Sequence, residues 1–322
     1  MSQDINMTDI FEAKKLIYSI ARETPLYKAQ DLSKTTNSDI YYKLEFLQDT
    51  RSFKVRGAAN FAMHLTKEKL RSGLTTYSTG NHGRATAHVA QKLGTDAKIC
   101  LSKNVPQNKI DGIKNSGGQV VVYGDSQDEA QEKANQLSQS ENRAVVPPFD
   151  HKHIICGQGT IGLEIIEKIP KLDNIIVPLS GGGLISGIAY AVKSINPDCK
   201  VYGISMKNGA AMYESLKKGK PVQIKEAESL ADSLQGGILL DNKYTFEMVE
   251  KYVDEVILVS EKEIKEAMKH AFYEEHFILE GAAAVGIAAI LSEKVDVSKQ
   301  KSAILLTGTN ISNEEFISII KN

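Results

Sequence analysis

Short runs of β-branched and other apolar residues alternate along the chain with longer segments whose apolar residues recur at helical spacing. The short runs predict strands over residues 40–44, 74–78, 97–101, 120–123, 175–179, 201–204, 256–259 and 303–306. The longer segments predict helices, among them 83–92, 126–137, 159–168 and 261–273. Strands and helices that alternate over most of a chain are typical of an α/β protein with largely parallel sheets.

In such sheets, ligands bind beyond the carboxyl ends of the strands, so the loops that directly follow strands are the places to search. One further feature divides the chain. Pro147 and Pro148 interrupt any regular element at that point. We interpret them as a crossing between two α/β lobes. Because small-ligand sites often lie at such interfaces, we expect the active site in the cleft between the lobes.

The composition narrows the function classes. The chain has 322 residues, 42% hydrophobic and 25% charged, which is typical of a globular protein of about two domains. Its net charge of −1 provides no basic field for nucleic acid. No apolar run approaches the roughly 18–20 residues of a membrane span, and residues 1–4 lack the pattern of a signal peptide. Three widely spaced cysteines, Cys100, Cys156 and Cys199, predict neither a disulfide framework nor a zinc site, and indicate a cytoplasmic protein.

The first candidate for chemistry is Lys54, which lies among small and apolar residues in Ser-Phe-Lys-Val-Arg-Gly-Ala-Ala, at the start of a predicted helix. Two interpretations stay open from these residues alone. Lys54 is either an ordinary surface lysine on a first helical turn or a functional amine. A functional amine here would be partly desolvated, which favours its neutral, nucleophilic form and allows a Schiff base with a carbonyl cofactor.

The second candidate is the loop Ser78-Thr79-Gly80-Asn81-His82, which follows a predicted strand and precedes a predicted helix. Hydroxyl groups and free backbone N–H groups at a helix N-terminus form an anion site of a size that suits a carboxylate. The alternative is a plain helix cap, because Ser, Thr and Asn all cap helices well.

The third candidate is Ser180-Gly181-Gly182-Gly183-Leu184, between a predicted strand and a helix. Consecutive glycines leave backbone N–H groups uncovered and able to wrap a phosphate. A dinucleotide site is the competing interpretation. It would need an acidic residue at the end of the next strand, and residues 203–206 contain none. A second GxGxxG match at residues 157–162 lacks the acid in the same way, so we set this interpretation aside.

The fourth candidate is Thr307, in Leu306-Thr307-Gly308-Thr309-Asn310 after the last predicted strand. Its hydroxyl lies at the carboxyl end of a strand, where it is placed to bond a ligand; the alternative is an ordinary turn residue.

Together these four loops resemble those of the fold-type II pyridoxal-phosphate enzymes, and within them the threonine/serine dehydratases and serine racemase. The resemblance runs nearly end to end and includes residues 24–26, 43–45, 157–160 and 280–282. It implies the two-lobed fold of the tryptophan synthase β-like enzymes, with mostly parallel sheets flanked by helices and the cofactor in the cleft. It also implies a large cofactor-binding domain of residues 1–52 and 149–322, a small domain of residues 53–148, and no C-terminal regulatory domain.

The resemblance assigns roles residue by residue. Lys54 would carry pyridoxal 5'-phosphate, Phe53 would pack on its ring, Asn81 would bond its 3-hydroxyl, and Thr307 would face its ring nitrogen. The phosphate would lie on the backbone of Ser180, Gly181, Gly182, Gly183 and Leu184. The substrate carboxylate would lie on Ser78, Thr79, Gly80, Asn81 and His82.

The implied activity is that of an ammonia-lyase. Such an enzyme removes water and ammonia from a β-hydroxy amino acid, here L-threonine or L-serine, and releases a 2-oxo acid. Lys54, freed by the substrate amine, would act as the general base. A neutral hydroxyl at Thr307 suits β-elimination. We weigh three alternatives: a racemase, with Thr79 as a second acid/base; a synthase that adds a thiol; and a binding module without catalysis.

Some positions depart from the family pattern. Arg51 stands where relatives usually have glycine, so the exact backbone conformation of the loop before Lys54 stays open. Ser205, Gly209 and Ala211 fall where serine racemase binds a divalent metal, and without carboxylates there we predict no metal. Ser233 replaces another glycine. Residues 208–212 and 230–234 resemble hydroxyectoine-utilisation dehydratases, a substrate-level alternative. Because relatives are commonly dimers or tetramers, we expect a homodimer.

Overall fold

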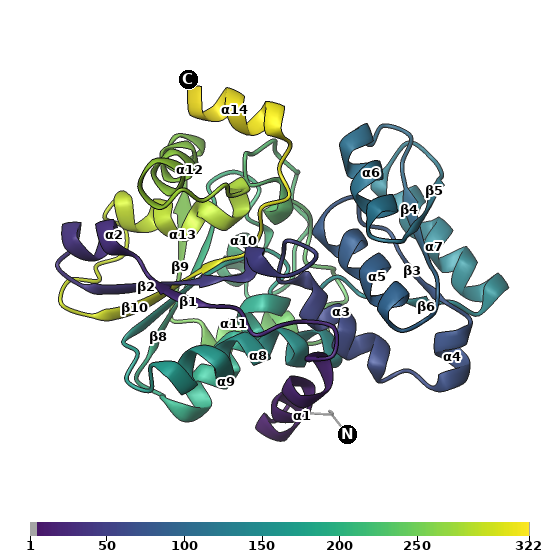
Figure 1. Ribbon diagram of the computed structural model, residues 1–322, viewed down its shortest axis with the longest axis horizontal. Helices are drawn as coiled ribbons and strands as arrows, with labels where there is room; N and C mark the ends of the chain where they lie inside the picture. The colour runs from purple at the N-terminus through teal and green to yellow at the C-terminus, as the bar shows by residue number, and fades with distance from the viewer. Residues whose placement is uncertain (1–4, 322) are drawn as a thin grey trace.

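The computed structural model describes residues 5–321. Residue 322 and residues 1–4, whose sequence led us to expect no signal peptide, lie outside the described residues. The chain forms two separate sheets, which Figure 1 shows on opposite sides of the molecule, each with its own helices. This confirms the α/β class with largely parallel strands.

The larger sheet has six strands in the order β1-β2-β10-β7-β8-β9. The edge strand β1 pairs antiparallel with β2, and every other neighbouring pair is parallel. The strands are β1 (Leu26–Lys28), β2 (Asp39–Leu44), β7 (Asn174–Pro178), β8 (Lys200–Met206), β9 (Glu255–Val259) and β10 (Lys301–Leu306). All of β7 is buried because helices cover both faces of the sheet, which explains its continuous apolar run.

The smaller sheet has four strands in the order β5-β4-β3-β6, all parallel. They are β3 (Leu74–Thr76), β4 (Ala97–Leu101), β5 (Gln119–Val122) and β6 (Ala144–Val145). These strands lie within the segment 53–148 that we expect to form the small domain. The boundaries of that domain stay a prediction.

Alternate residues of a strand point to opposite faces, and the two cores of the larger sheet follow that rule. Ile176 and Ile304 pack with α12 (Glu261–Glu275) and α13 (Gly281–Leu291). Their neighbours Ile175 and Leu305 pack on the other face with α8 (Lys152–Lys168) and α9 (Gly183–Ile195). The remaining elements around this sheet are α1 (Met7–Ile17), α2 (Gln30–Thr35), η1 (Glu45–Leu47), α10 (Ala211–Lys218), η2 (Asp232–Leu234), α11 (Thr245–Tyr252) and α14 (Asn313–Lys321).

The helices of the smaller sheet are α3 (Lys54–Met63), α4 (Lys67–Arg71), α5 (Asn81–Lys92), α6 (Gln107–Asn115) and α7 (Gln127–Glu141). In Figure 1, α3 lies between the two sheets, and it packs against α8 on one side and α5 on the other. The residue expected to carry the cofactor, Lys54, is the first residue of this connecting helix.

The eight predicted strands agree with the observed ones to within two residues at each end, whereas the short strands β1 and β6 were not predicted. Two predicted helices have capping boxes at their starts. Ser126 and Ser260 each accept a hydrogen bond from the backbone three residues on, and Glu129 and Glu263 bond back. The helix predicted from Gly159 is longer than expected, since α8 already begins at Lys152.

The GxGxxG match at residues 157–162 therefore lies inside α8 and presents no loop to a dinucleotide. Its glycines serve close helix packing instead. A Cβ atom on Gly157 would lie 2.6 Å from the Arg56 carbonyl of α3, and one on Gly162 would lie 2.9 Å from the Ile188 carbonyl of α9. Gly187 meets α8 even more closely, since its Cβ would lie 2.2 Å from the Ile155 carbonyl. These glycines let α3, α8 and α9 pack backbone to backbone beneath the site.

Within residues 5–321, no helix is long and apolar enough to cross a bilayer.

Candidate active site

The Lys54 amine lies at the junction of the two lobes. Its Nζ donates a hydrogen bond to the Pro148 carbonyl at 2.8 Å and lies 5.4 Å from the centre of the Phe53 ring. No carboxylate among residues 5–321 forms an ion pair with it. Burial lowers the pKa of Lys54 to about 8, although its side chain as a whole is only half-buried. The amine is therefore much easier to deprotonate than a surface lysine, as a functional amine requires.

The loop before Lys54 runs beside the loop after β10. Ser52 and Gly308 form an antiparallel bridge, and the Phe53 N–H donates to the Thr307 carbonyl at 3.1 Å. Thr307 is itself buried beside this bridge. Arg51 has a φ of 58°, in the left-handed region. Glycine adopts that conformation without strain, which fits the glycine that the resemblance expects at this position.

The loop Ser78–His82 leads into α5, which begins at Asn81. The N-cap residue is Gly80, and no side chain caps the helix. The hydroxyls of Ser78 and Thr79 are thus not used as caps, which removes the structural alternative for this motif. His82 points away from the loop, with Nε2 3.0 Å from the Val146 carbonyl. Burial and the nearby Lys54 charge lower the pKa of His82 to about 3, so the ring is neutral and donates this hydrogen bond.

The glycine loop is shaped by Phe149 beneath it. A Cβ atom on Gly181 would lie 2.5 Å from the Phe149 ring, and one on Gly183 would lie 2.7 Å from the Phe149 carbonyl. Gly182 has a φ of 88° and serves as the N-cap of α9 without a side-chain bond. The first N–H groups of α9 have no partner within the helix, so this loop is a cradle of free donors at a helix N-terminus.

Two site residues had no role in the sequence analysis: Glu280 and Asn310. The Asn81 Nδ2 atom donates to Glu280 Oε1 at 2.7 Å, and Asn81 Oδ1 accepts from Asn310 Nδ2 at 2.6 Å. Both partners lie in sequence motifs quoted for the family resemblance, but their pairing crosses about two hundred residues. An available signal was the single acid of residues 277–285, an otherwise apolar and small run in which a carboxyl is expected to be buried.

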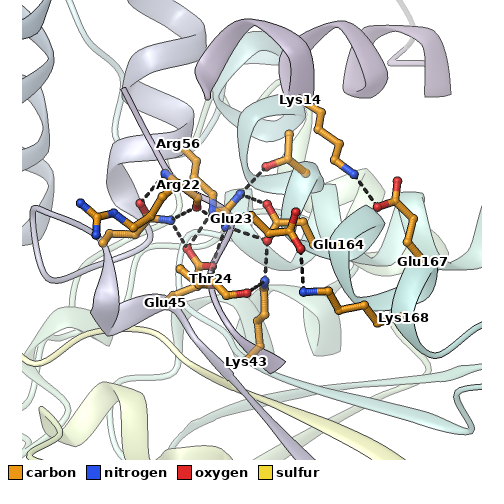
Figure 2. Close-up of polar contacts among 12 residues, drawn as sticks. Lys14, Arg22, Glu23, Thr24, Lys43, Glu45, Arg56, Glu164, Glu167 and Lys168 are labelled. Carbon is orange, nitrogen blue, oxygen red and sulfur yellow. Dashed lines mark hydrogen bonds and ion pairs between the residues drawn. The ribbon is translucent and has the colours of Figure 1, made fainter. Parts of the chain in front are cut away.

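A buried ionic network supports α3 beneath Lys54 (Figure 2). Arg56, two residues after Lys54, pairs with Glu45 from η1 and with Glu164 from α8. Lys43 from β2 pairs with the same Glu164. All four charged side chains are fully buried, and the two positive charges balance the two negative ones. Burial opposes ionisation of Glu164, but Arg56 and Lys43 more than offset it, so its pKa is lowered.

Other residues that the sequence analysis considered lie outside this arrangement. His151 is the N-cap of α8, and His153 in its first turn stacks on His64 with 3.9 Å between ring centres. Cys156 is buried in α8, where burial raises the pKa of its thiol to about 12. Among the described residues, no three His, Cys, Asp or Glu side chains gather closely enough to hold a metal ion.

The structure thus joins three of the four predicted loops by direct hydrogen bonds and connects the glycine loop to Lys54 through the adjoining Pro148 and Phe149. A cradle for an anion and a lysine amine with a lowered pKa on one α/β scaffold are the features of an enzyme that holds a phosphorylated carbonyl compound. Comparison with known proteins makes the class specific. The family model of the pyridoxal-phosphate dependent enzymes matches residues 17–308 of the sequence, so the chain belongs to this family.

Individual relatives support the same family assignment. The L-threonine ammonia-lyase of Thermotoga maritima is 40% identical over 307 residues, which cover 95% of this chain and 76% of that protein. The processed form of threonine deaminase isoform 2 from Solanum lycopersicum has a TM-score of 0.91 at 34% identity, over 98% of this chain and 88% of that one. Maize serine racemase has a TM-score of 0.92 at 31% identity, over 100% of this chain and 98% of that one.

These findings confirm the expected fold-type II architecture and the resemblance to threonine/serine dehydratases and serine racemase. The cofactor of this protein is pyridoxal 5'-phosphate. The hydroxyectoine subgroup and the role of each site residue stay predictions.

Proposed function

We propose that this protein is a pyridoxal-phosphate dependent threonine/serine ammonia-lyase, which eliminates water and ammonia from a β-hydroxy amino acid and releases a 2-oxo acid. The observation that carries the proposal is the Lys54 amine, which lies at the lobe junction, donates to the Pro148 backbone carbonyl and has a lowered pKa. The relatives named as threonine ammonia-lyase and threonine deaminase match nearly the whole chain, which supports L-threonine as the first substrate to test.

The residues of the site fit the cofactor. A side chain at Gly181 or Gly183 would collide with Phe149, so these positions require glycine. The first N–H groups of α9 have no partner within the helix, and such donors suit a phosphate dianion. We assign phosphate binding to Ser180, Gly181, Gly182, Gly183 and Leu184. We assign the covalent attachment to Lys54 and the remaining cofactor contacts to Phe53, Asn81 and Thr307.

The chemistry divides between cofactor and chain. Bound pyridoxal phosphate supplies an electron sink for the pair of electrons left at the substrate Cα atom. Lys54 Nζ takes the Cα proton, and its pKa of about 8 lets the neutral amine form at near-neutral pH. Thr307 offers a neutral hydroxyl rather than a carboxylate to the ring nitrogen. Departure of the β-hydroxyl then removes the negative charge promptly, so β-elimination is favoured.

The substrate carboxylate has a ready site at the start of α5. Neither Ser78 nor Thr79 caps α5 with its hydroxyl, and Gly80 leaves open space above its Cα atom. We assign carboxylate binding to Ser78, Thr79, Gly80, Asn81 and His82. His82 contributes through its backbone, because its ring is already bonded to Val146.

The test is release of 2-oxo acid from a panel of amino acids: L-threonine, L-serine, 3-hydroxyaspartate and amino acids derived from hydroxyectoine. We expect a yellow enzyme that is most active on threonine or serine, and a colourless, inactive Lys54→Ala variant. A wild-type protein that stays colourless after purification with pyridoxal phosphate would overturn the proposal. If the enzyme instead prefers the hydroxyectoine-derived amino acids, it is a hydroxyectoine-utilisation dehydratase.

Thr79 supports racemisation as a second candidate. Its hydroxyl stands where serine racemase has its second acid/base serine, and maize serine racemase has a TM-score of 0.92 to this chain. The added methyl group restricts the rotamers of Thr79, which disfavours proton delivery from the opposite face. Chiral analysis of serine after incubation decides the question, because a racemase accumulates D-serine whereas an ammonia-lyase accumulates pyruvate.

We also propose a homodimer. The edge of the larger sheet carries a patch of large apolar side chains at Tyr27, Phe46, Leu47, Phe277 and Ile278. The Phe277 ring contacts those of Tyr27 and Phe46 at 5.8 and 5.2 Å between centres, and Leu47 and Ile278 are exposed beside them. A second copy would cover this patch. Light scattering of the double variant Leu47→Glu, Ile278→Glu should report monomers. Leu240→Glu, which alters an exposed leucine outside the patch, should not change the assembly.

The division into a large domain of residues 1–52 and 149–322 and a small domain of residues 53–148 is likewise our proposal, supported by the confinement of the smaller sheet to residues 74–145. A cytoplasmic location is supported by Cys100, Cys156 and Cys199, which are buried free thiols.

A further inference from the structure

Glu280 is a buried carboxyl at the meeting point of three chain segments. Its residue is only 4% exposed, at the N-cap of α13. Oε1 accepts the hydrogen bond from Asn81 of α5, and Oε2 accepts from the Asn310 N–H in the loop after β10 at 3.1 Å. One side chain therefore ties the start of α5 to the loop that carries Thr307.

The surrounding backbone is shaped to admit this carboxyl. A Cβ atom on Gly308 would lie 2.5 Å from Glu280 Oε1, so any side chain there would displace the carboxyl. Asn310 completes the arrangement. Its Nδ2 donates to Asn81 Oδ1 and to the Thr50 carbonyl at 3.0 Å, and its Oδ1 accepts from the Arg84 guanidinium at 2.9 Å.

Two contacts fix which way the Asn81 amide faces: Glu280 accepts from its Nδ2 atom, and Asn310 donates to its Oδ1 atom. An ionised carboxylate only accepts hydrogen bonds, so Asn81 must present its Nδ2 atom to it. One Nδ2 hydrogen is then used and the other is left to donate elsewhere. A protonated or amidated side chain at position 280 can itself donate and no longer requires Nδ2 at that place, so the Asn81 amide is then oriented by Asn310 alone.

We propose that Glu280 is a positioning residue that works as a carboxylate and orients the Asn81 amide so that its second N–H donates toward the cofactor. This inference rests on the proposed function, because only there is Asn81 assigned to the cofactor hydroxyl.

The charges around Glu280 make its ionisation sensitive to pH in the working range. The pKa of Glu280 is raised to about 7, first by burial and then by the charge of Asp232 in η2, against the hydrogen bonds from Asn81 and Asn310 and the charge of Arg84, which lower it. Asp232 is itself paired with Lys109 of α6 at 2.9 Å. Arg84 faces Arg51 as well as Glu280, so these charges around the site compensate one another only in part.

The test compares the wild type with Glu280→Gln, which keeps the shape of the side chain and cannot ionise. Two quantities are measured between pH 5.5 and 9: the dissociation constant of pyridoxal phosphate from its absorbance, and kcat/KM for threonine. We expect both wild-type quantities to improve through a step near pH 7. The variant should lack this step and bind the cofactor about tenfold more weakly at pH 8, the equivalent of one hydrogen bond to a charged group. The wild-type and variant curves should converge below the step.

Glu275→Gln is the matched control. Glu275 is also a buried glutamate with a raised pKa, at the end of α12, and it is not part of the site. Its substitution should leave the step in place. Glu280→Asp should keep a step, displaced in pH, because it keeps an ionisable carboxyl.

A step that persists in Glu280→Gln, or an unchanged cofactor affinity, overturns the inference while the ammonia-lyase activity stands. A wild type that binds no cofactor overturns the proposed function first. If Glu280→Gln fails to fold, Gly308→Ala gives the same information, because it displaces the carboxyl from Asn81 and should weaken cofactor binding at pH 8. Unchanged binding in that variant would also refute the role of Glu280.

Discussion

Replacing Glu164 with glutamine removes one negative charge from the buried network beneath α3. Glu164 is fully buried and accepts hydrogen bonds from Lys43, from both terminal nitrogens of Arg56 and from the Tyr18 hydroxyl. Glutamine can accept these bonds at only one of its two terminal atoms. Lys43 and Arg56 would then share the single negative charge of Glu45, leaving one positive charge uncompensated inside the protein (Figure 2).

The expected cost is large. Breaking a buried ion pair by removing one partner destabilises a protein by about 3–5 kcal/mol, because the remaining charge stays desolvated. At roughly 2–4 °C per kcal/mol, the melting temperature should fall by about 6–20 °C. The measurement is thermal and urea unfolding, followed by circular dichroism, on protein saturated with cofactor.

The chain contains a matched control in the same helix. Glu167, one turn after Glu164, pairs with Lys14, but its side chain is 48% exposed. Glu167→Gln should cost about 1 kcal/mol or less, because water screens such a pair. A Glu164→Gln variant no less stable than Glu167→Gln would refute the reasoning. So would a Lys43→Met, Glu164→Gln double variant less stable than Glu164→Gln alone, because the double change leaves Arg56 and Glu45 as a balanced pair.

Three further changes test separate parts of the structure. Arg51→Gly should raise the free energy of unfolding by about 0.5–1 kcal/mol in urea, since φ is 58° there; a loss would show that the arginine side chain stabilises the loop. Gly187→Ala should lower it by at least about 2 kcal/mol, since the new Cβ atom meets the Ile155 carbonyl, and an unchanged value would contradict the close helix packing. Lys54→Met should stabilise the cofactor-free protein by about 1–2 kcal/mol below pH 8, after allowance for partial exposure and the lost bond to Pro148, and this gain should vanish as pH rises toward 10.5. Parallel pH curves for that variant and the wild type would refute the desolvated amine.

Much of the fold could be predicted from local pattern. The apolar runs that became β4 and β7 are short and lie between helical segments, so their strand character needs no tertiary information. Ser126 and Ser260 mark helix starts because a capping serine and a glutamate three residues later bond reciprocally within one turn. Signals of this kind act over a few residues and do not depend on distant parts of the chain.

The same local signals were ambiguous where one residue pattern serves two purposes. The GxGxxG of residues 157–162 resembles a phosphate loop, yet it forms the interior of α8, where its glycines admit neighbouring backbones. The Ser180–Leu184 loop is glycine-rich for a different reason, since Phe149 fills the space beneath it. What surrounds each glycine distinguishes the two, and sequence spacing does not record those surroundings.

The sequence by itself determined the α/β alternation, the resemblance to the family and the four candidate loops, with Lys54 in the first of them. The tertiary structure alone decided that Pro148 receives the Lys54 amine and that Glu280 bonds Asn81, because these partners lie far apart in the chain. It also decided how readily each group ionises. Burial, which lowers the pKa of Lys54 and raises that of Glu280, depends on every segment folded around a side chain rather than on its neighbours in sequence.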